Sequence, residues 1–335
     1  MNSFGRLFRV SIFGESHGNS TGIVIDGCPA GISLDQGDFE KDLSRRRSGR
    51  SGTTPRREAD MPVFASGLHN GRTTGSPMAI FFDNSDTRPS DYEQFREVPR
   101  PGHADFTASK KWKNFNDNRG GGHFSGRITT GLVAAGVVAK KIISPAIVAA
   151  SLLEAGGESN IDAAVQKAME DKDSIGGIIE CTGKNIPAGL GEPFFDSVES
   201  VISHTVFSVP AIKAIEFGSG FASARMRGSR HNDPLISPDG KTSTNNAGGI
   251  NGGITNGNDL VFRIAVKPTS SIALPQETVN IKSGKITTLE TGGRHDSCIA
   301  LRMPVIIEAA TALALADLLL IHRGINNPDT GNTGF

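Results

Sequence analysis

Hydrophobic and polar positions alternate near the start of the chain. Phe8, Val10 and Ile12 are separated by polar residues between Leu7 and Phe13. A period of two is typical of a strand with one buried face, so this run predicts a strand. Similar strand patterns recur along the chain between segments with helical periodicity.

Helices are indicated most clearly at three places. They cover residues 38–47, residues 128–143, and a run that Pro304 opens and that ends before Gly324. Proline suits the first turn of a helix, and glycine commonly follows the last turn. The second helix is rich in alanine and glycine, which would allow another element to pack closely against it.

Two segments of the chain resemble each other in sequence, which suggests a duplicated core. Residues 22–32 and residues 177–190 each combine a strand pattern with a Pro-Ala-Gly turn, although chance similarity would also explain this. Linkers rich in proline, serine or charge do not divide the chain. We therefore expect a single large α/β (α+β) domain over residues 1–335, with residues 325–335 as a loose tail.

Charge and composition narrow the function classes. The 335 residues carry 35 Lys and Arg against 35 Asp and Glu, which gives no global electrostatic case for nucleic-acid or membrane binding. Three distant cysteines without CxxC spacing argue against a disulfide framework or a structural zinc site. The apolar run at residues 309–321 is interrupted by Asp317, and no apolar leader opens the chain. These features favour a soluble protein of the reducing cytoplasm.

Candidate chemistry begins directly after the first strand, at Gly-Glu-Ser-His-Gly, residues 14–18. The glycines permit close backbone approach to a ligand, which makes Ser16 and His17 candidate site residues. A turn whose serine and histidine only satisfy local backbone groups is the alternative.

Arginines gather at the end of the first predicted helix. Arg46 follows Leu43 by three residues and Phe39 by seven, so it should share their inward face, where a buried arginine needs an anion. Arg45 should point elsewhere. For the run as a whole, which extends to Arg50, a solvated basic face is an equally good reading.

Two glycine-rich segments are candidate anion sites. Residues 118–127 approach the second helix, whose free N–H groups would favour phosphate, with Ser125 and Arg127 as additional donors. This segment lacks the P-loop and dinucleotide-binding patterns. Residues 245–257 precede a strand that ends at Val266, and hydroxyls and a lysine follow at residues 267–271; a plain surface loop is the alternative there.

Two further histidines lie beside acids, in residues 100–105 and 292–296. In an extended segment Arg294 and Asp296 would face one side, so they could share a pocket. A metal site is weakly supported, because none of the histidines has short ligand spacing. Together, histidine motifs, arginines and glycine loops in a neutral chain suggest an enclosed site for multiply anionic ligands.

These residues resemble the chorismate synthase family from Phe4 to Arg323. The resemblance rests on Gly-Glu-Ser-His-Gly, on the arginine run with Thr-Pro-Arg-Arg-Glu, and on Arg-Pro-Gly-His-Ala-Asp. It also rests on the Gly-Gly-Gly run, Lys-Pro-Thr-Ser-Ser, and Gly-Arg-His-Asp with Cys298. It implies a β-α-β sandwich in which helices pack between two antiparallel sheets, a pseudo-duplicated core and a homotetramer.

The resemblance also implies a reaction. A carbon–oxygen lyase of this family removes phosphate from 5-enolpyruvylshikimate 3-phosphate by anti-1,4-elimination and yields chorismate, the precursor of aromatic amino acids. Reduced FMN is required without net redox change: in the family's proposed mechanism it lends an electron as the allylic bond breaks, and its N5 takes hydrogen from C6. NADPH, contacted by Arg46 and Arg50, or a separate flavin reductase would supply the reducing equivalents.

Site residues follow by motif match. His17 would donate a proton on the flavin or substrate side, His103 would lie near the departing phosphate, and Asp296 would assist proton movement at N5. The expected substrate contacts are Ser16, Arg46, Arg50 and Arg127. The expected flavin contacts are His123, Phe124, Ser125, Ala211, Gly252, Lys267, Pro268, Thr269, Ser270, Ser271 and Arg294.

Two departures and two competing functions accompany this reading. Many relatives have Arg-Ser-Ser or Arg-Ala-Ser where this chain has His123, Phe124 and Ser125, and the loop around Arg50 is one residue shorter than in many of them.

A nucleic-acid-binding module that uses residues 45–57 is one alternative function, and the neutral net charge and the few aromatic residues oppose it. A metal-assisted phosphatase built on the three histidines would be lost to chelators and indifferent to flavin.

Overall fold

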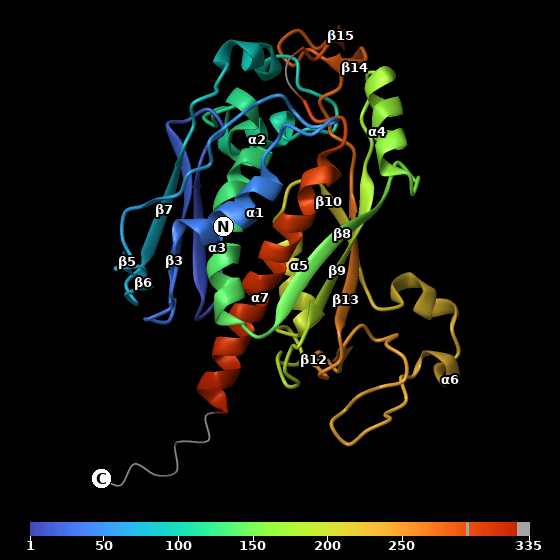
Figure 1. The fold of residues 1–335 in the computed structure, drawn as a ribbon. Helices are drawn as coiled ribbons and strands as arrows, with labels where there is room; N and C mark the ends of the chain where they lie inside the picture. Colours follow the sequence, from blue (N-terminus) through green and yellow to red (C-terminus); the bar gives the residue numbers. More distant parts are fainter. Residues whose placement is uncertain (293–294, 327–335) are drawn as a thin grey trace.

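Two antiparallel sheets face each other across a layer of helices (Figure 1) in a computed structural model that describes residues 1–292 and 295–326. The first sheet has the strand order β1-β2-β3-β7-β4 and the second has the order β10-β13-β9-β8. The first contains β1 Ser3–Phe4, β2 Arg9–Gly14, β3 Ser20–Asp26, β4 Val63–Phe64 and β7 Met78–Asp83. The second contains β8 Ile147–Ala155, β9 Gly177–Lys184, β10 Ile212–Phe217 and β13 Leu260–Val266. This is the expected sandwich.

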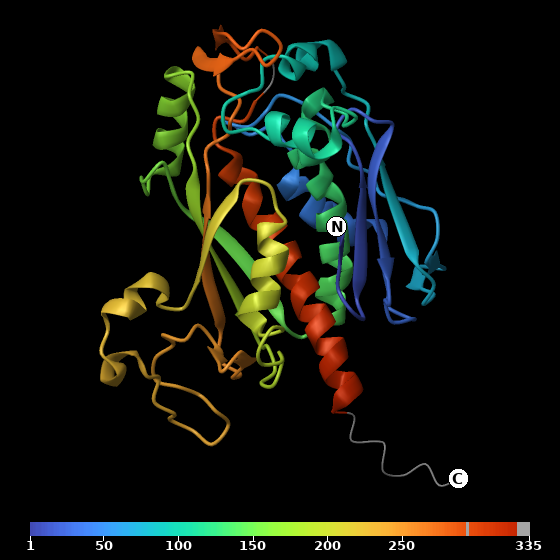
Figure 2. The same ribbon diagram turned by 180° about the vertical axis from the view of Figure 1, so that it is seen from behind.

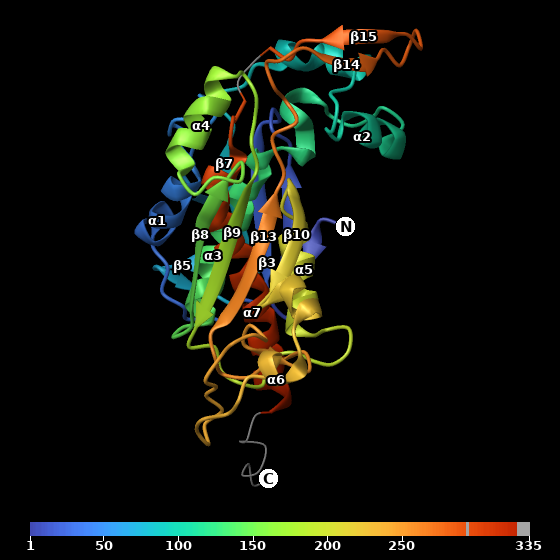
Figure 3. The ribbon, with the colours of Figure 1, turned by 90° about the vertical axis from the view of Figure 1, so that its right-hand side faces the viewer.

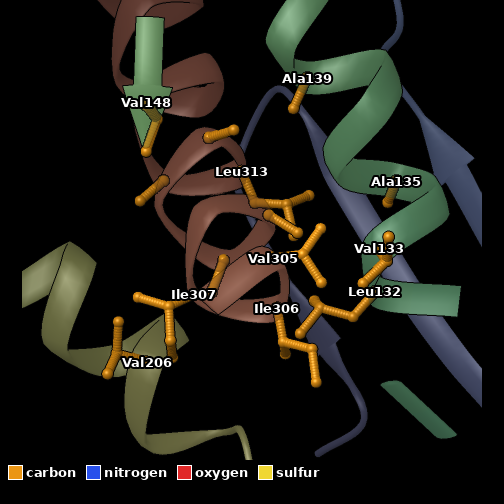
Figure 4. Packing of buried hydrophobic residues seen from close by; sticks show 14 of the residues in the cluster. Leu132, Val133, Ala135, Ala139, Val148, Val206, Val305, Ile306, Ile307 and Leu313 are labelled. Carbon is orange, nitrogen blue, oxygen red and sulfur yellow. The ribbon is translucent and has the colours of Figure 1, made fainter. Parts of the chain in front are cut away.

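Four helices lie between the sheets, as the reverse view also shows (Figure 2), and they carry many of the buried core residues. They are α1 Gln36–Arg46, α3 Thr129–Ile142, α5 Val198–Phe207 and α7 Met303–Ile325. Buried side chains of α3 and α7 interleave there with Val206 of α5 and Val148 of β8 (Figure 4). The close approach of α3 and α7 needs glycine at position 136, because a Cβ there would lie 2.3 Å from the Cβ of Ala309. The expectation of close packing by a small-residue helix is confirmed.

The two halves of the chain share one order of elements. In each half, a pair of antiparallel strands (β2 and β3, β8 and β9) is followed by a helix (α1, α5). A third strand (β7, β13) then pairs with the far side of the second strand, and a long core helix (α3, α7) follows. The two segments with similar sequences supply β3 and β9, which hold matching interior positions in their sheets. The duplication accounts for their sequence similarity.

Smaller elements lie outside the sandwich. Hairpin β14–β15 and α2 lie at one end of the molecule, and α6 lies at the other (Figure 3). These elements are α2 Asp105–Trp112, α4 Ile161–Glu170, α6 Gly228–His231, β5 Leu68–His69, β6 Arg72–Thr73, β11 Ile250–Asn251, β12 Ile254–Thr255, β14 Gln276–Val279 and β15 Ile286–Leu289. Short 3-10 turns are η1 Pro89–Arg96, η2 Arg119–Phe124, η3 Gly126–Ile128, η4 Gly220–Arg225 and η5 Ile299–Arg302.

The predicted helices form with small differences at their ends. Helix α1 begins two residues early, because Asp35 caps it in a reciprocal pair with Asp38. Helix α7 continues through Gly324 to Ile325. The predicted loose tail from Ile325 lies outside the described residues from residue 327 onward.

Asp317 anchors the N-terminal segment to the central helix. Its carboxylate accepts hydrogen bonds from the backbone N–H groups of Arg6, Leu7 and Phe8 at 2.7 to 3.0 Å. The stretch Ile299–Ile325 has the length and composition of a membrane span, but 83% of its most apolar window is buried inside the protein. It is the core helix of the sandwich, and the aspartate that interrupts its apolar run holds the edge of the first sheet.

We expect Asp317→Asn to lower the free energy of unfolding by about 2 to 3 kcal/mol, since the amide's NH2 would replace an acceptor that buried N–H groups require. Equilibrium urea unfolding measures this change. Asp171→Asn, which removes only an exposed pair with Lys167 on α4, should change it by less than about 0.5 kcal/mol. Equal stabilities for both variants would contradict this role of Asp317.

Candidate active site

A cavity of about 1090 Å³ collects residues from segments that are far apart in the sequence. Its wall includes β1, β2, the end of α1, the loops before α2 and α3, the end of α5, and the loops after β13 and before α7. The N-terminus, α2 and β10 lie on one side of the molecule (Figure 3), and segments around them contribute to this wall. The cavity therefore depends on both halves of the fold.

The cavity wall is strongly cationic although the chain is neutral. Among the described residues, nine lysines and arginines line it against three carboxylates. The cations are Arg46, Arg47, Arg56, Arg57, Arg100, Arg127, Lys213, Lys267 and Arg302, and the carboxylates are Glu58, Asp60 and Asp296. Such a concentration of one sign in a concave site attracts and holds anionic ligands.

Asp60 joins two buried arginines. Its carboxylate lies 2.6 Å from Nη2 of Arg46 and also accepts from Nη1 of Arg127. Burial alone would raise the pKa of Asp60, but the two guanidinium groups outweigh burial and hold it below its usual value. Burial, together with Arg127 and Arg302, lowers the pKa of Arg46 to about 10. Arg46 thus lies on the inward face, as predicted, and a carboxylate of the chain is its anion.

Arg45 points away, as expected, and has another partner. It forms a bidentate ion pair with the buried Glu308 of α7, which also accepts from Lys140 of α3. This pair ties α1 to the core helices and so holds the segment that carries Arg46. The basic run therefore serves both structure and cavity.

Ser16 is held in place from two sides. Its hydroxyl accepts from Nη1 of Arg56 at 2.8 Å, and its backbone N–H donates to the carbonyl of Gly122 at 3.0 Å. His17 is not part of the cavity lining: its Nδ1 lies 3.2 Å from the Ser16 hydroxyl, and its ring packs edge-on against Tyr92, with 5.1 Å between centroids. His17 thus contacts two residues of the cavity wall, Ser16 and Tyr92.

The glycine run before α3 supports these two residues. Gly120, Gly121 and Gly122 all have positive φ, at 60°, 81° and 54°. A Cβ on Gly120 would lie 2.1 Å from Nδ1 of His17, so only glycine fits between this loop and the histidine. Sequence reasoning interpreted the run as an anion loop, and the close packing against the 14–18 turn is a second reason for its glycines.

His103 belongs to a compact polar cluster on the cavity wall. Its Nδ1 lies 2.6 Å from the carboxylate of Asp105, which also forms a bidentate ion pair with Arg100. Arg100 donates in turn to the Ser271 hydroxyl at 2.9 Å. Lys267 and Ser270 both donate to the carbonyl of Gly102. The Lys-Pro-Thr-Ser-Ser segment is thereby fastened to the His103 loop.

Asp296 faces the cavity from the loop before α7. It accepts from the backbone N–H of Thr54 at 3.0 Å and from Nη2 of Arg302 at 2.6 Å. Arg302 was missed by sequence reasoning, since a single arginine at the start of an apolar helix carries no signal. Arg56 and Arg100 belong to the sequence motifs but were not predicted as site residues, and Asp60 belongs to no motif. All three line the cavity.

His123 and Phe124, which differ from the family pattern, both have contacts that hold them in place. The Nδ1–H of His123 donates to the carbonyl of Gly14 at 2.8 Å, because a carbonyl can only accept. Phe124 packs against Trp112, with 5.5 Å between ring centroids. Both residues line the cavity, and His123 adds a further link between the glycine run and the 14–18 turn.

Most predicted site residues meet at this cavity. Those that line it are Ser16, Arg46, His103, His123, Phe124, Ser125, Arg127, Ala211, Lys267, Pro268, Thr269, Ser270, Ser271 and Asp296. Arg50 is exposed and outside the lining, and Gly252 lies at the tip of the β11–β12 hairpin, also outside it. Arg294 lies outside the described residues. Across residues 1–292 and 295–326, no group of three or more His, Cys, Asp and Glu side chains is arranged to hold a metal ion.

Comparisons with known proteins agree on one family. The family model described as chorismate synthase matches residues 8–320. A chorismate synthase from Chitinophaga pinensis is 60% identical over 327 residues, which cover 97% of this chain and 98% of that protein. One from Methanocaldococcus jannaschii is 40% identical, covering 96% of each chain. A crystal structure of a chorismate synthase superposes with a TM-score of 0.74 at 25% identity, covering 96% of this chain and 94% of the other.

Proposed function

The chain belongs to the chorismate synthase family, and from this premise we propose that its cationic cavity binds reduced FMN and 5-enolpyruvylshikimate 3-phosphate together. The protein is a carbon–oxygen lyase of the shikimate pathway and of aromatic amino-acid biosynthesis. It eliminates phosphate from this substrate to give chorismate, and its family is flavin-dependent. The reduced FMN form and the residue roles below are part of the proposal.

The size and charge of the cavity support two anionic ligands. Its volume of about 1090 Å³ exceeds the range of about 300 to 1000 Å³ that is usual for a single small-molecule site. The substrate carries a phosphate and two carboxylates, and FMN adds a second phosphate. The excess of cations over carboxylates on the wall matches this combined negative charge.

The expected flavin residues suit a planar group with a polar edge. The hydroxyl of Thr269 is buried on the cavity wall without a hydrogen-bond partner in the protein, and Lys267 and Ser270 lie beside it. Phe124 and Ala211 offer apolar surface. These residues, with His123, Ser125, Pro268 and Ser271, would hold FMN. Reduced FMN, when bound, lends electron density to the breaking carbon–oxygen bond and recovers it, so net redox change is zero.

The substrate residues would bind and orient the anionic groups. Arg46 and Arg127 line the cavity and converge on Asp60, which holds both guanidinium groups in place. Ser16 would add a hydroxyl donor. Their clustered positive charge stabilises the phosphate as its bond to carbon breaks.

Three residues would manage protons. His103 would act beside the departing phosphate, His17 would donate on the flavin or substrate side, and Asp296 would assist removal of hydrogen from C6. Burial, reinforced by Arg100 and Lys267, lowers the pKa of His103 despite the opposing effect of Asp105. Burial and these two cations therefore favour the neutral form of His103, and a phosphate beside it would favour its protonation.

Assembly, reductant and location complete the proposal. Phe194 and Phe195 have 90% and 91% of their surface exposed, which favours burial between subunits of a homotetramer. A separate flavin reductase or NADPH would supply the reducing equivalents. A cytoplasmic location is supported by three free cysteines, all buried as thiols.

Anaerobic turnover tests the function directly. The purified protein is mixed with chemically reduced FMN and 5-enolpyruvylshikimate 3-phosphate, and chorismate and phosphate are followed together. Equal release with reduced FMN, and none with oxidised FMN, is expected. Phosphate without chorismate, or turnover that ignores the flavin's redox state, would refute the proposal.

A further inference from the structure

His103, Asp105 and Arg100 form an interlocked group on the cavity wall. One oxygen of Asp105, Oδ1, lies 2.6 Å from Nδ1 of His103 and 2.8 Å from Nη2 of Arg100. These two nitrogens are themselves only 3.0 Å apart. The side chains of Arg100 and Asp105 are almost fully buried, whereas that of His103 is one-fifth exposed.

These distances assign the proton on His103. A guanidinium group has only donors, and an ionised carboxylate has only acceptors. Burial would raise the pKa of Asp105, but hydrogen bonds from Arg100 and His103 hold it far below its usual value, so the group is ionised at neutral pH. Nδ1 must therefore carry the proton that reaches Asp105. The short approach of Arg100 to Nδ1 follows because both nitrogens donate to one oxygen.

The other nitrogen of His103 is then the one that meets a ligand. Nε2 faces the glycine run, where a Cβ on Gly121 would lie 3.5 Å from it. His103, Gly120 and Ser125 line the cavity together. A neutral ring with its proton on Nδ1 presents a lone pair at Nε2 to whatever occupies this part of the cavity.

We propose that Asp105 is a positioning residue that keeps the proton of His103 on Nδ1, so that Nε2 alone exchanges a proton with the substrate's phosphate. The proton moves between a phosphate oxygen and Nε2, and no other bond changes in this step. Asp105 stabilises the imidazolium that forms, in the way a carboxylate does in hydrolytic triads. The proposal rests on the proposed function, since it takes His103 to act beside the leaving phosphate.

The charged groups around His103 have opposing effects on its protonation. Asp105 favours its protonation, while Arg100 and Lys267 disfavour it, and His295 lies close enough to interact with it. Removing the negative charge of Asp105 leaves the cations unopposed. The pKa of His103 should then fall further, and its ring should lose the single tautomer.

The test uses the full chain with ¹⁵N-labelled histidine. The resting wild-type protein should show the Nδ1–H tautomer for His103, identified as the one of eight histidine signals that His103→Gln removes. Asp105→Asn should lower the pKa of His103, mix its tautomers, and reduce kcat by about 100-fold or more, with KM for substrate within about threefold. Asp171→Asn, directly after α4, should leave all of these unchanged.

Several results would overturn the proposal. A wild-type His103 with its proton on Nε2 would do so even if Asp105→Asn failed to fold. An unchanged tautomer and pKa in Asp105→Asn, or a raised KM at unchanged kcat, would show that Asp105 acts only through Arg100. The tautomer is measured without substrate, so an absence of chorismate formation in the turnover assay is a separate failure.

Discussion

Arg127→Met is expected to reduce kcat/KM by about 1000-fold, the upper range for removing one preorganised donor from a site of developing negative charge. Arg127 is buried and donates to Asp60, to the side-chain oxygen of Asn84 and to the carbonyl of Asp83. Its guanidinium is therefore fixed before a ligand arrives. Methionine would remove a cation from the cavity and leave Asp60 paired with Arg46 alone.

Lysine at position 127 should restore only part of this loss. It keeps the charge but cannot reach three acceptors at once, so we expect an activity between those of methionine and arginine. Steady-state kinetics with reduced FMN measures the effect, and circular dichroism checks the fold. The matched control is Arg9→Met, which removes an exposed pair with Asp26 outside the cavity and should change kcat/KM less than twofold. Wild-type kinetics in Arg127→Met would exclude Arg127 from the site.

Gly120→Ala is expected to lower kcat by about 100-fold or more, because small displacements of catalytic groups carry costs of this size. The added Cβ would lie 2.1 Å from Nδ1 of His17 and 2.6 Å from the Ser16 hydroxyl. It would also place alanine at a φ of 60°, which costs about 1 to 2 kcal/mol. The 14–18 turn must shift, while the core helices need not move.

Turnover and thermal unfolding, measured together, separate displacement from loss of fold. We expect Gly120→Ala to remain folded with a modestly lower melting temperature. Gly228→Ala at the start of α6 is the control, since its Cβ would meet nothing within 4 Å and its φ is not positive. Full activity in Gly120→Ala would mean that the position of His17 does not matter for turnover.

Local patterns predicted the elements well. Helix α1 extends from Gln36 to Arg46 against a predicted 38–47, and α3 from Thr129 to Ile142 against 128–143. Periodicity reports which face of an element is buried, so it also placed Arg46 inward and Arg45 away. Such inferences succeed because they need only residues within a few turns of one another.

The family resemblance supplied most of the cavity wall, and it did so without geometry. The motifs named Ser16, His103 and Asp296, and the structure brings all three to one cavity. Sequence offered no reason for Gly252 or Arg50 to lie elsewhere, because a motif gives the order of residues and not their position in space. His17 was expected at the reaction, and its Nδ1 lies 3.2 Å from the hydroxyl of Ser16, which lines the cavity.

The sequence by itself determined the periodicity of the strands and helices, the inward position of Arg46 and the family, because each depends on neighbouring residues or on ordered motifs. Only the tertiary structure decided the pairings. Asp60 meets an arginine 67 residues away, and Asp296 accepts from a backbone group 242 residues away. Packing of two sheets around shared helices brings these groups together, and the balance of buried charge that results has no counterpart in local sequence.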